Sequence, residues 1–259
     1  MEQSVIVEHK EAIAVVKLNR PKAYNAFDSS TIKALRDILM SLSRDEFVKG
    51  VVLTGVGKAF CAGGDLRWIS SYKDRYGDTF YELAAVYHQA ILEIRRMPKP
   101  VVAAINGLAA GGGFSMALAC DFRIMESSAV LRQAYTSNGL SIDGGGTFML
   151  PRMVGTARAM EIAVFDPVIS AEKALQWGLV TEVVEDGKSV DAALELVGQI
   201  TNGALCSFRA SKKLINDSFN TSFEVQLEQE RRWLARCADH PHGREGIKAF
   251  LEKRKPEFG

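Results

Sequence analysis

Residues 99–124 read KPVVAAINGLAAGGGFSMALACDFRI, and this stretch decides the fold class. Residues 101–105 form an apolar, partly β-branched run, which predicts a buried strand. A turn is expected at Asn106-Gly107, and the glycines 111–113 open a helix of small apolar residues. Residues 121–125 predict a further buried strand. Strand, glycine turn, helix and strand in this order are typical of an α/β protein.

The same unit occurs earlier in the chain. Residues 50–54 predict a buried strand, which leads into the glycine-rich loop GVGKAFCAGGDL at 55–66. We expect residues 1–200 to form an α/β core and residues 201–259 to form a helical C-terminal region. Apolar spacing and capping residues predict the other elements: a hairpin at 5–7 and 13–18, strands near 130–131 and at 179–184, and helices at 28–42, 79–96, 148–153, 157–164, 171–177 and 190–201.

Composition excludes several classes of partner. The chain has 259 residues, a net charge of +1 and 47% hydrophobic residues, which suits one large domain with a sizeable core. A near-neutral charge without a long run of one sign disfavours a nucleic-acid or membrane surface as the partner. Residues 101–120 carry no charge, yet Asn106 and the central glycines favour a buried core over a membrane span.

Cysteine and histidine usage points to a reduced protein without a metal. No CxxC pair occurs among the four cysteines. Cys61, Cys120 and Cys206 have small or apolar neighbours, so we expect reduced core thiols. The N-terminal residues mix acidic and basic side chains without an apolar signal core, which favours a cytoplasmic location. The four histidines show no ligand spacing with cysteines or carboxylates, so no metal site is expected.

Two glycine turns are the candidate chemical feature. The turns at 61–65 and 110–114 each follow a predicted strand. Glycine lets a ligand approach the backbone closely, and the first N–H groups of a helix have no partner within it. Two such turns brought together could hold one anionic oxygen. Neither turn fits GxGxxG or GxxxxGK[ST], so a nucleotide-binding reading is weak.

Six segments, in order along nearly the whole chain, resemble the crotonase (enoyl-CoA hydratase/isomerase) superfamily. The resemblance implies an α/β fold built as a spiral of ββα units, with C-terminal helices that form trimers. It implies a homotrimer or a hexamer, an acyl-CoA thioester as substrate, and no cofactor besides the coenzyme A of that substrate. The segments are LNRPKAYNAF (18–27), GKAFCAGGDL (57–66), residues 99–124, GGGTFMLPRMVG (144–155), ISAEKALQWGLVTEVV (169–184) and GIKAFLEKRKPEF (246–258).

The resemblance also assigns roles to residues. It implies that the N–H groups of Gly64 and Gly112 form an oxyanion hole, which holds the thioester oxygen as the substrate becomes an enolate. It implies that a further set binds coenzyme A, in which the last two members often reach the coenzyme of a neighbouring subunit. That set comprises Lys22, Ala23, Ala62, Gly63, Asp65, Leu66, Phe250 and Lys253.

The type of reaction depends on three positions. The family's hydratases use two glutamates, and here those positions hold Ser115 and Tyr135, which cannot act as carboxylate bases. Asp143 in LSIDGGG matches an aspartate found in several isomerases, including the phenylacetate-pathway type. We therefore expect an enoyl-CoA isomerase in which Asp143 moves a proton while Ser115 and Tyr135 line the pocket. A hydratase remains an alternative.

A second alternative is a hydrolytic dehalogenase. The 4-chlorobenzoyl-CoA dehalogenase type carries a histidine matching His88, an aromatic residue matching Tyr135 and an aspartate matching Asp143. There the aspartate attacks the aromatic ring and the histidine activates water. However, apolar neighbours recur around His88 at helical spacing, which predicts a packing histidine. A catalytically inactive RNA-binding relative is a third alternative, and the near-neutral charge argues against it.

Overall fold

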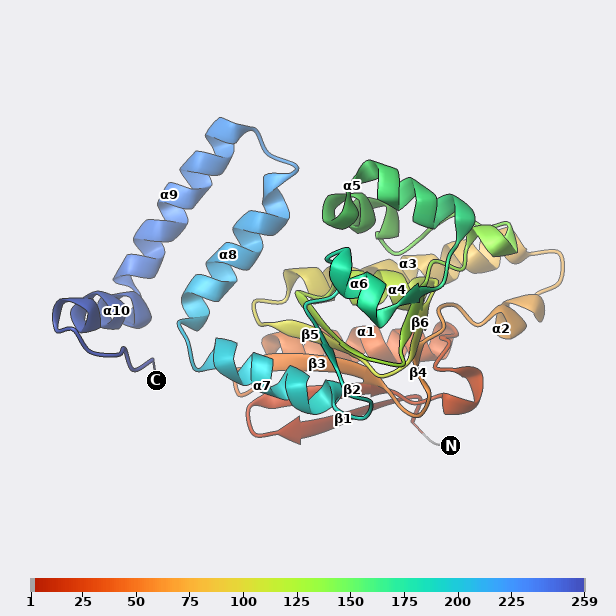
Figure 1. Ribbon diagram of the computed structural model, residues 1–259, viewed down its shortest axis with the longest axis horizontal. Helices are drawn as coiled ribbons and strands as arrows, with labels where there is room; N and C mark the ends of the chain where they lie inside the picture. The colour runs from red at the N-terminus through yellow and green to blue at the C-terminus, as the bar shows by residue number, and fades with distance from the viewer. Residues whose placement is uncertain (1–2, 259) are drawn as a thin grey trace.

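The computed structural model describes residues 3–258 and arranges their strands in two sheets (Figure 1). The larger sheet has the order β1-β2-β3-β5-β7-β10, and the smaller has the order β4-β6-β8-β9. The strands of the larger sheet are β1 (Val5–Lys10), β2 (Ile13–Leu18), β3 (Gly50–Gly55), β5 (Val101–Ile105), β7 (Phe122–Glu126) and β10 (Glu182–Val184). Those of the smaller sheet are β4 (Ala59–Cys61), β6 (Leu108–Ala110), β8 (Val130–Arg132) and β9 (Ile169–Ser170).

Helices surround these sheets and continue beyond them. The longer ones are α1 (Ser29–Arg44), α3 (Tyr76–Arg96), α5 (Gly146–Phe165), α7 (Ser189–Thr201), α8 (Leu205–Ser218), α9 (Phe223–Asp239) and α10 (Pro241–Leu251). The shorter ones are α2 (Leu66–Ser70), α4 (Gly112–Ala119) and α6 (Ala171–Gln176), with 3₁₀ turns at Pro21–Ala23 and Thr136–Asn138. Strands alternate with helices along the chain, which confirms the predicted α/β class.

Both faces of the larger sheet are covered. From β2 onward its strands pair in parallel, and parallel sheets are normally buried on both sides. Val52 and Val102 pack against α7, whereas Val51, Leu53 and Val101 belong to the main core with α1 and α3. Successive side chains of a strand point to opposite faces, so the uncharged runs recognised in the sequence fill two separate layers.

The smaller sheet supplies the second strand of each ββα unit. After β3 the chain forms β4 and then α2, and after β5 it forms β6 and then α4. Each unit is thus a strand of the larger sheet, a strand of the smaller one and a helix, as the ββα resemblance implied. The sequence reading placed only loops at β4 and β6. That expectation was wrong because a three-residue strand between glycines is too short to show a period.

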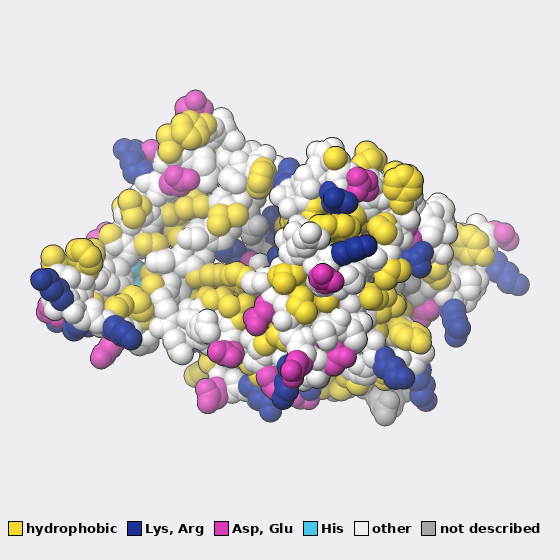
Figure 2. Space-filling model, in the orientation of Figure 1, with side chains coloured by type: hydrophobic (Ala, Val, Ile, Leu, Met, Phe, Trp, Pro, Cys, Tyr) yellow, Lys and Arg dark blue, Asp and Glu magenta, His cyan; other side chains and the backbone are white. Residues whose placement is uncertain are grey.

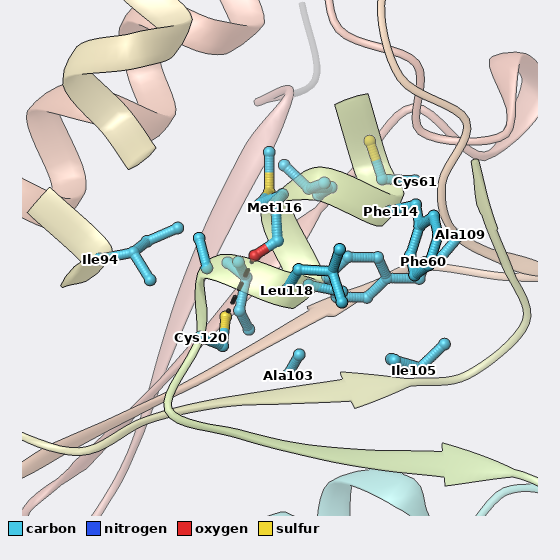
Figure 3. Packing of buried hydrophobic residues seen from close by; sticks show 14 of the residues in the cluster. Phe60, Cys61, Ile94, Ala103, Ile105, Ala109, Phe114, Met116, Leu118 and Cys120 are labelled. Carbon is cyan, nitrogen blue, oxygen red and sulfur yellow. Dashed lines mark hydrogen bonds between the residues drawn. The ribbon is translucent and has the colours of Figure 1, made fainter. Parts of the chain in front are cut away.

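Side chains from both sheets meet in the centre of the molecule. Figure 3 shows Phe60 of β4 close to Phe114 of α4, while Ala103 and Ile105 project from β5 below them. These four side chains are fully buried, as is that of Leu118 of α4. The uncharged stretch 101–120 is therefore core. Within the described residues, no helix has the length and apolar character needed to cross a membrane.

Local signals for helix ends were read correctly in two cases. The Asp28 side chain accepts the N–H of Thr31 at 2.8 Å and begins α1, as expected for an N-cap. In α5, Gly155 has a non-helical backbone at φ 76° and ψ 162°. This break separates the two short helices that were predicted on either side of it.

The C-terminal helices α8, α9 and α10 lie to one side of the core (Figure 1). Lys212 of α8 anchors them, because its ammonium group donates to the Ile94 and Lys99 carbonyls at 3.1 Å and to the Asp121 carboxylate at 2.7 Å. Arg95 and Asn216 add two hydrogen bonds, at 2.8 and 3.1 Å. Burial raises the pKa of Asp121 and lowers the pKa of Lys212, so each charge depends on its partner.

We expect Lys212→Met to destabilise the protein by about 3–5 kcal/mol, because it leaves the Asp121 charge buried and unpaired. The matched control is Lys213→Met, whose exposed ion pair with Asp217 should contribute only about 0.5 kcal/mol. Urea unfolding at one fixed protein concentration measures both variants. Equal midpoints for the two would contradict the anchoring role.

Candidate active site

The two glycine turns touch each other. β4 and β6 pair in parallel, with Cys61 opposite Ala109, so the turns that follow them leave the same edge of the sheet. A Cβ on Gly63 would lie 2.8 Å from the Gly112 nitrogen, and one on Gly113 would collide with the Cys61 carbonyl. Only glycine permits this approach, and at Gly63 the φ of +88° also requires it.

The N–H groups of Gly64 and Gly112 are available to a ligand. Gly64 forms a bridge with Phe27 in which Gly63 O and Asp65 N make the hydrogen bonds, at 2.8 and 2.9 Å. The Gly64 N–H takes no part in this bridge. Gly112 is the first residue of α4, where an N–H has no helical partner. Within residues 3–258 neither group has an acceptor.

Two aromatic rings form the wall beside Gly112. Phe27 and Tyr87 stack with their centroids 4.8 Å apart, and the Tyr87 hydroxyl donates to the Gly112 carbonyl at 2.5 Å. Burial raises the pKa of Tyr87 far above its usual range, so this hydroxyl stays a donor. A Cβ on Gly112 would lie 2.8 Å from Phe27 Cζ, so any side chain at this position requires the ring or the turn to shift.

An ion-pair cluster holds the first turn against the loop that precedes α1. Arg20 binds the Asp65 carboxylate at 2.8 Å and lies 3.4 Å from that of Asp28. Asp65 in turn caps α2 through the N–H groups of Arg67 and Trp68, at 3.1 Å each. The segment around Lys22 and the segment around Gly63 thus form one rigid unit, as a shared ligand would require.

A cavity of about 410 Å³ opens beside Gly64. Its walls come from α3 and from residues 135–143, and most of its lining is apolar or aromatic. Such a cavity suits an acyl group. Asp143 is the single carboxylate among the lining residues that the structure describes, which are Phe27, Gly64, Gly77, Phe80, Tyr81, Leu83, Ala84, Tyr87, Tyr135, Leu140, Ser141, Ile142 and Asp143.

Asp143 forms a dyad with His88. The His88 Nε2 and the Asp143 Oδ1 lie 2.6 Å apart. The His88 side chain is 51% exposed and lines a neighbouring cavity of about 470 Å³ together with Gly144 and Gly145. The prediction of a packing histidine was wrong, because the ring lies on the outer side of α3 and faces the turn at 143–145.

Ser115 and Tyr135 occupy different positions. Ser115 is fully buried, and its hydroxyl donates to the Asp143 carbonyl at 2.7 Å. It lies behind the cavity and not on its lining, contrary to expectation, and it fixes the Asp143 loop. Tyr135 does line the cavity. Burial raises the pKa of the Tyr135 hydroxyl, while the Asp143 backbone and Ser115 act in the opposite direction.

The residues predicted to bind coenzyme A fall into two groups. Those of the Lys22 loop and of the segment 62–66 lie together, because the Ala62 N–H donates to the Tyr24 carbonyl at 3.0 Å. Phe250 and Lys253 are exposed and lie on and just after α10, at the opposite end of the molecule's long axis from α2 (Figure 1). Within one chain the structure does not bring them to the cavity.

Sequence reasoning missed the residues that shape the cavity. Phe80, Leu83, Ala84 and Tyr87 face it from α3, and their spacing of three and four is a helical signal. Phe27 has no such signal. Its place depends on the bridge to Gly64, which joins segments far apart in the sequence.

Comparison with known proteins agrees with this geometry. The family model described as enoyl-CoA hydratase/isomerase matches residues 8–259. The chain belongs to that family. It is 36% identical to 1,2-epoxyphenylacetyl-CoA isomerase of Escherichia coli K12, covering 98% of this chain and 97% of the relative. The crystal structure of an enoyl-CoA hydratase from Polaromonas sp. JS666 superimposes with a TM-score of 0.93 at 35% identity, over 98% and 99% of the two chains.

The same family includes a third kind of relative. The 4-chlorobenzoyl coenzyme A dehalogenase-2 of an Arthrobacter species is 31% identical over 96% of this chain and 91% of its own. Isomerase, hydratase and dehalogenase names therefore all occur among similar proteins. The chain is a family enzyme with the crotonase fold.

We expect Gly112→Ala to lower kcat for an acyl-CoA substrate by about 100-fold, since the new Cβ would push the turn away from Phe27 and misplace an N–H by a fraction of an ångström. Gly198→Ala is the control. It lies in α7 with nothing within 4 Å of its Cβ position, so its activity should equal that of the wild type. Full activity in Gly112→Ala would show that the Gly112 N–H does not take part in catalysis.

Proposed function

We propose that the protein is an enoyl-CoA isomerase, which shifts a double bond through a thioester enolate. Asp143 is the one carboxylate that the described cavity lining contains, and it shares this lining with Gly64. This observation carries the proposal. The hydratase arrangement needs a pair of carboxylates, whereas Ser115 is buried behind the wall and the Tyr135 hydroxyl has a raised pKa.

The proposed reaction needs one proton carrier. The Asp143 carboxylate removes a proton from the carbon next to the acyl carbonyl or conjugated to it, and the electron pair moves onto the thioester oxygen. The N–H groups of Gly64 and Gly112 hold that oxygen, and each such donor is typically worth about 3–4 kcal/mol in a transition state. The same carboxyl then returns the proton two carbons away, so that the base is regenerated and no atom is gained or lost.

The dyad fits this role. One oxygen of Asp143 contacts His88 at 2.6 Å, which leaves the other oxygen for the substrate. Ser115 holds the Asp143 carbonyl from behind. The carboxylate is thus oriented from two sides without a further carboxylate nearby.

We expect Asp143→Asn to lower kcat for isomerisation of a 3-enoyl-CoA by about 100-fold or more, because general-base catalysis contributes that much and an amide cannot take the proton. Binding of the CoA ester should persist, since the change is nearly isosteric. Steady-state absorbance assays and calorimetric titration measure the two quantities. Asp186→Asn is the control, because Asp186 is exposed, binds the Ser128 N–H and is not among the residues that line the cavity. Unchanged turnover in Asp143→Asn would show that the base is another group.

A second candidate is favoured by the His88–Asp143 contact. In a hydrolytic dehalogenation, an Asp143 oxygen attacks the halogen-bearing ring carbon and halide leaves. Water then attacks the resulting ester at its carboxyl carbon, with its proton passing to His88, and the hydroxylated ring is released as the carboxylate re-forms. The exposed His88 ring could receive that proton.

His88→Gln separates the two reactions. The isomerase proposal expects this variant to keep 3-enoyl-CoA turnover within about tenfold, because a glutamine can still hydrogen-bond to Asp143. It also expects no chloride release from 4-chlorobenzoyl-CoA by the wild type and no ¹⁸O from labelled water in the isomerised product. Chloride release by the wild type, with a covalent aryl-enzyme accumulating in His88→Gln by mass spectrometry, would instead establish the dehalogenase. Water addition to a 2-enoyl-CoA would establish a hydratase.

Oligomer formation would complete the coenzyme site. Figure 2 shows apolar side chains over the C-terminal helices, and α9 and α10 expose Phe223, Leu234, Ile247, Phe250 and Leu251. Exposed apolar groups of this kind mark association surfaces. We propose a homotrimer, alone or paired as a hexamer, in which Phe250 and Lys253 reach the coenzyme of a neighbouring subunit.

A further inference from the structure

A group of thiol and imidazole side chains lies away from the acyl cavity, where the C-terminal helices meet. Cys206 is on the first turn of α8, and His240 lies between α9 and α10. His242 is on the first turn of α10. One ligand atom from each of these three residues lies within 4.8 Å of the other two. No local sequence pattern indicates this group, because Cys206 is distant from the histidines along the chain.

These residue types match one class of ligand. Thiolate sulfur and imidazole nitrogen bind zinc at about 2.3 and 2.0–2.1 Å in tetrahedral sites. Ligand atoms around such an ion lie about 3.3–3.6 Å apart, and the three atoms here lie within 4.8 Å of one another. His240 is exposed and Cys206 is half-buried, so side-chain rotation is the movement that binding would require of them.

We propose that Cys206, His240 and His242 bind a zinc-type divalent ion, with water as the fourth ligand. The ion would join the start of α8 to the junction of α9 and α10. The inference does not depend on the reaction proposed above.

Binding requires an exchange of partners at His240, and the other two ligands also have contacts to adjust: Cys206 Sγ lies 3.9 Å from Ser207 Oγ, and the His242 ring lies beside Phe258 with centroids 5.5 Å apart. The His240 Nδ1 accepts the His242 N–H at 3.1 Å and so caps α10. A neutral imidazole has a single lone pair, so a ring that binds the ion gives up this bond. The freed N–H lies at an exposed helix start, where water replaces the ring. Loading is thus expected to change the environment of the His242 amide.

The charges around the group predict how a control substitution changes metal affinity. Cys206 and His240 line a cavity of about 700 Å³ together with Arg95, Arg96, Arg209 and Arg236. These cations oppose a divalent ion, and a bound thiolate offsets only one of the ion's two charges. Removing a nearby positive charge without disturbing the backbone around the group should strengthen binding. Arg236, on α9, meets the group through its backbone carbonyl, which accepts the His240 N–H at 3.1 Å and would remain in Arg236→Gln, while its guanidinium lies over the Trp233 ring.

The test uses the full-length protein after dialysis against a chelator. Zinc should bind with a stoichiometry of about one per chain. Cobalt(II) in its place should show the thiolate-to-metal charge-transfer band in the near ultraviolet. Cys206→Ser should abolish that band, and His240→Ala should weaken zinc binding by at least about tenfold. Two-dimensional NMR or hydrogen exchange should show the His242 amide altered by zinc.

Matched variants distinguish this site from other thiols and imidazoles. Cys237→Ser removes the thiol that donates to the Cys206 carbonyl at 3.8 Å but is not one of the three ligands, and His9→Gln removes an exposed histidine on β1. Both should bind zinc as the wild type does, and Arg236→Gln should bind it at least as tightly. The proposal is overturned if the wild type takes up no zinc, if cobalt shows no thiolate band, or if Cys237→Ser loses the band while Cys206→Ser keeps it.

Discussion

Backbone-to-backbone contact between two short strands and their turns is the constraint on which the site depends. Gly63 lies against the Gly112 nitrogen and Gly113 against the Cys61 carbonyl, with no room for a Cβ at either place. Because β4 and β6 are parallel, both turns leave the same edge and their N–H groups can face one volume. Burial raises the pKa of Cys61 to about 12, so the thiol beneath this contact remains neutral and adds no charge to it. The proposed pair of oxygen-binding N–H groups thus depends on close backbone packing and not on any side chain.

Long elements and the order of the ββα units could be read from the sequence, because runs such as Val101–Ile105 carry a clear apolar signal. The smaller sheet could not, since its strands have two or three residues. Gly64, Gly112 and Asp143 were predicted as site residues from glycine patterns and family resemblance, and Gly64 and Asp143 line the cavity. Phe27 and Ser115 were missed or misplaced, because their roles depend on contacts with Gly64 and with the Asp143 carbonyl, which no local pattern records.

His88 shows why helical spacing alone misleads. Its apolar neighbours in the sequence pack inward, as Tyr87 does, while the next position along the helix points outward. Whether an outward histidine has a function depends on which loop lies above it, and here residues 143–145 do. The dyad therefore arises from tertiary structure, and it leaves both hydrolytic and proton-shift chemistry compatible with one set of side chains.

The helix α3 has a consequence for how this enzyme can change its substrate. One end of it lines the acyl cavity through Phe80 and Leu83, and the other end carries Arg95 and the Ile94 carbonyl, which hold α8. A helix of 21 residues tilts as a stiff rod. Widening the cavity for a bulkier acyl chain would therefore swing the far end and strain the attachment of α8. Substitution of smaller side chains on α3 would enlarge the cavity without moving the helix, and is therefore the easier route to larger substrates.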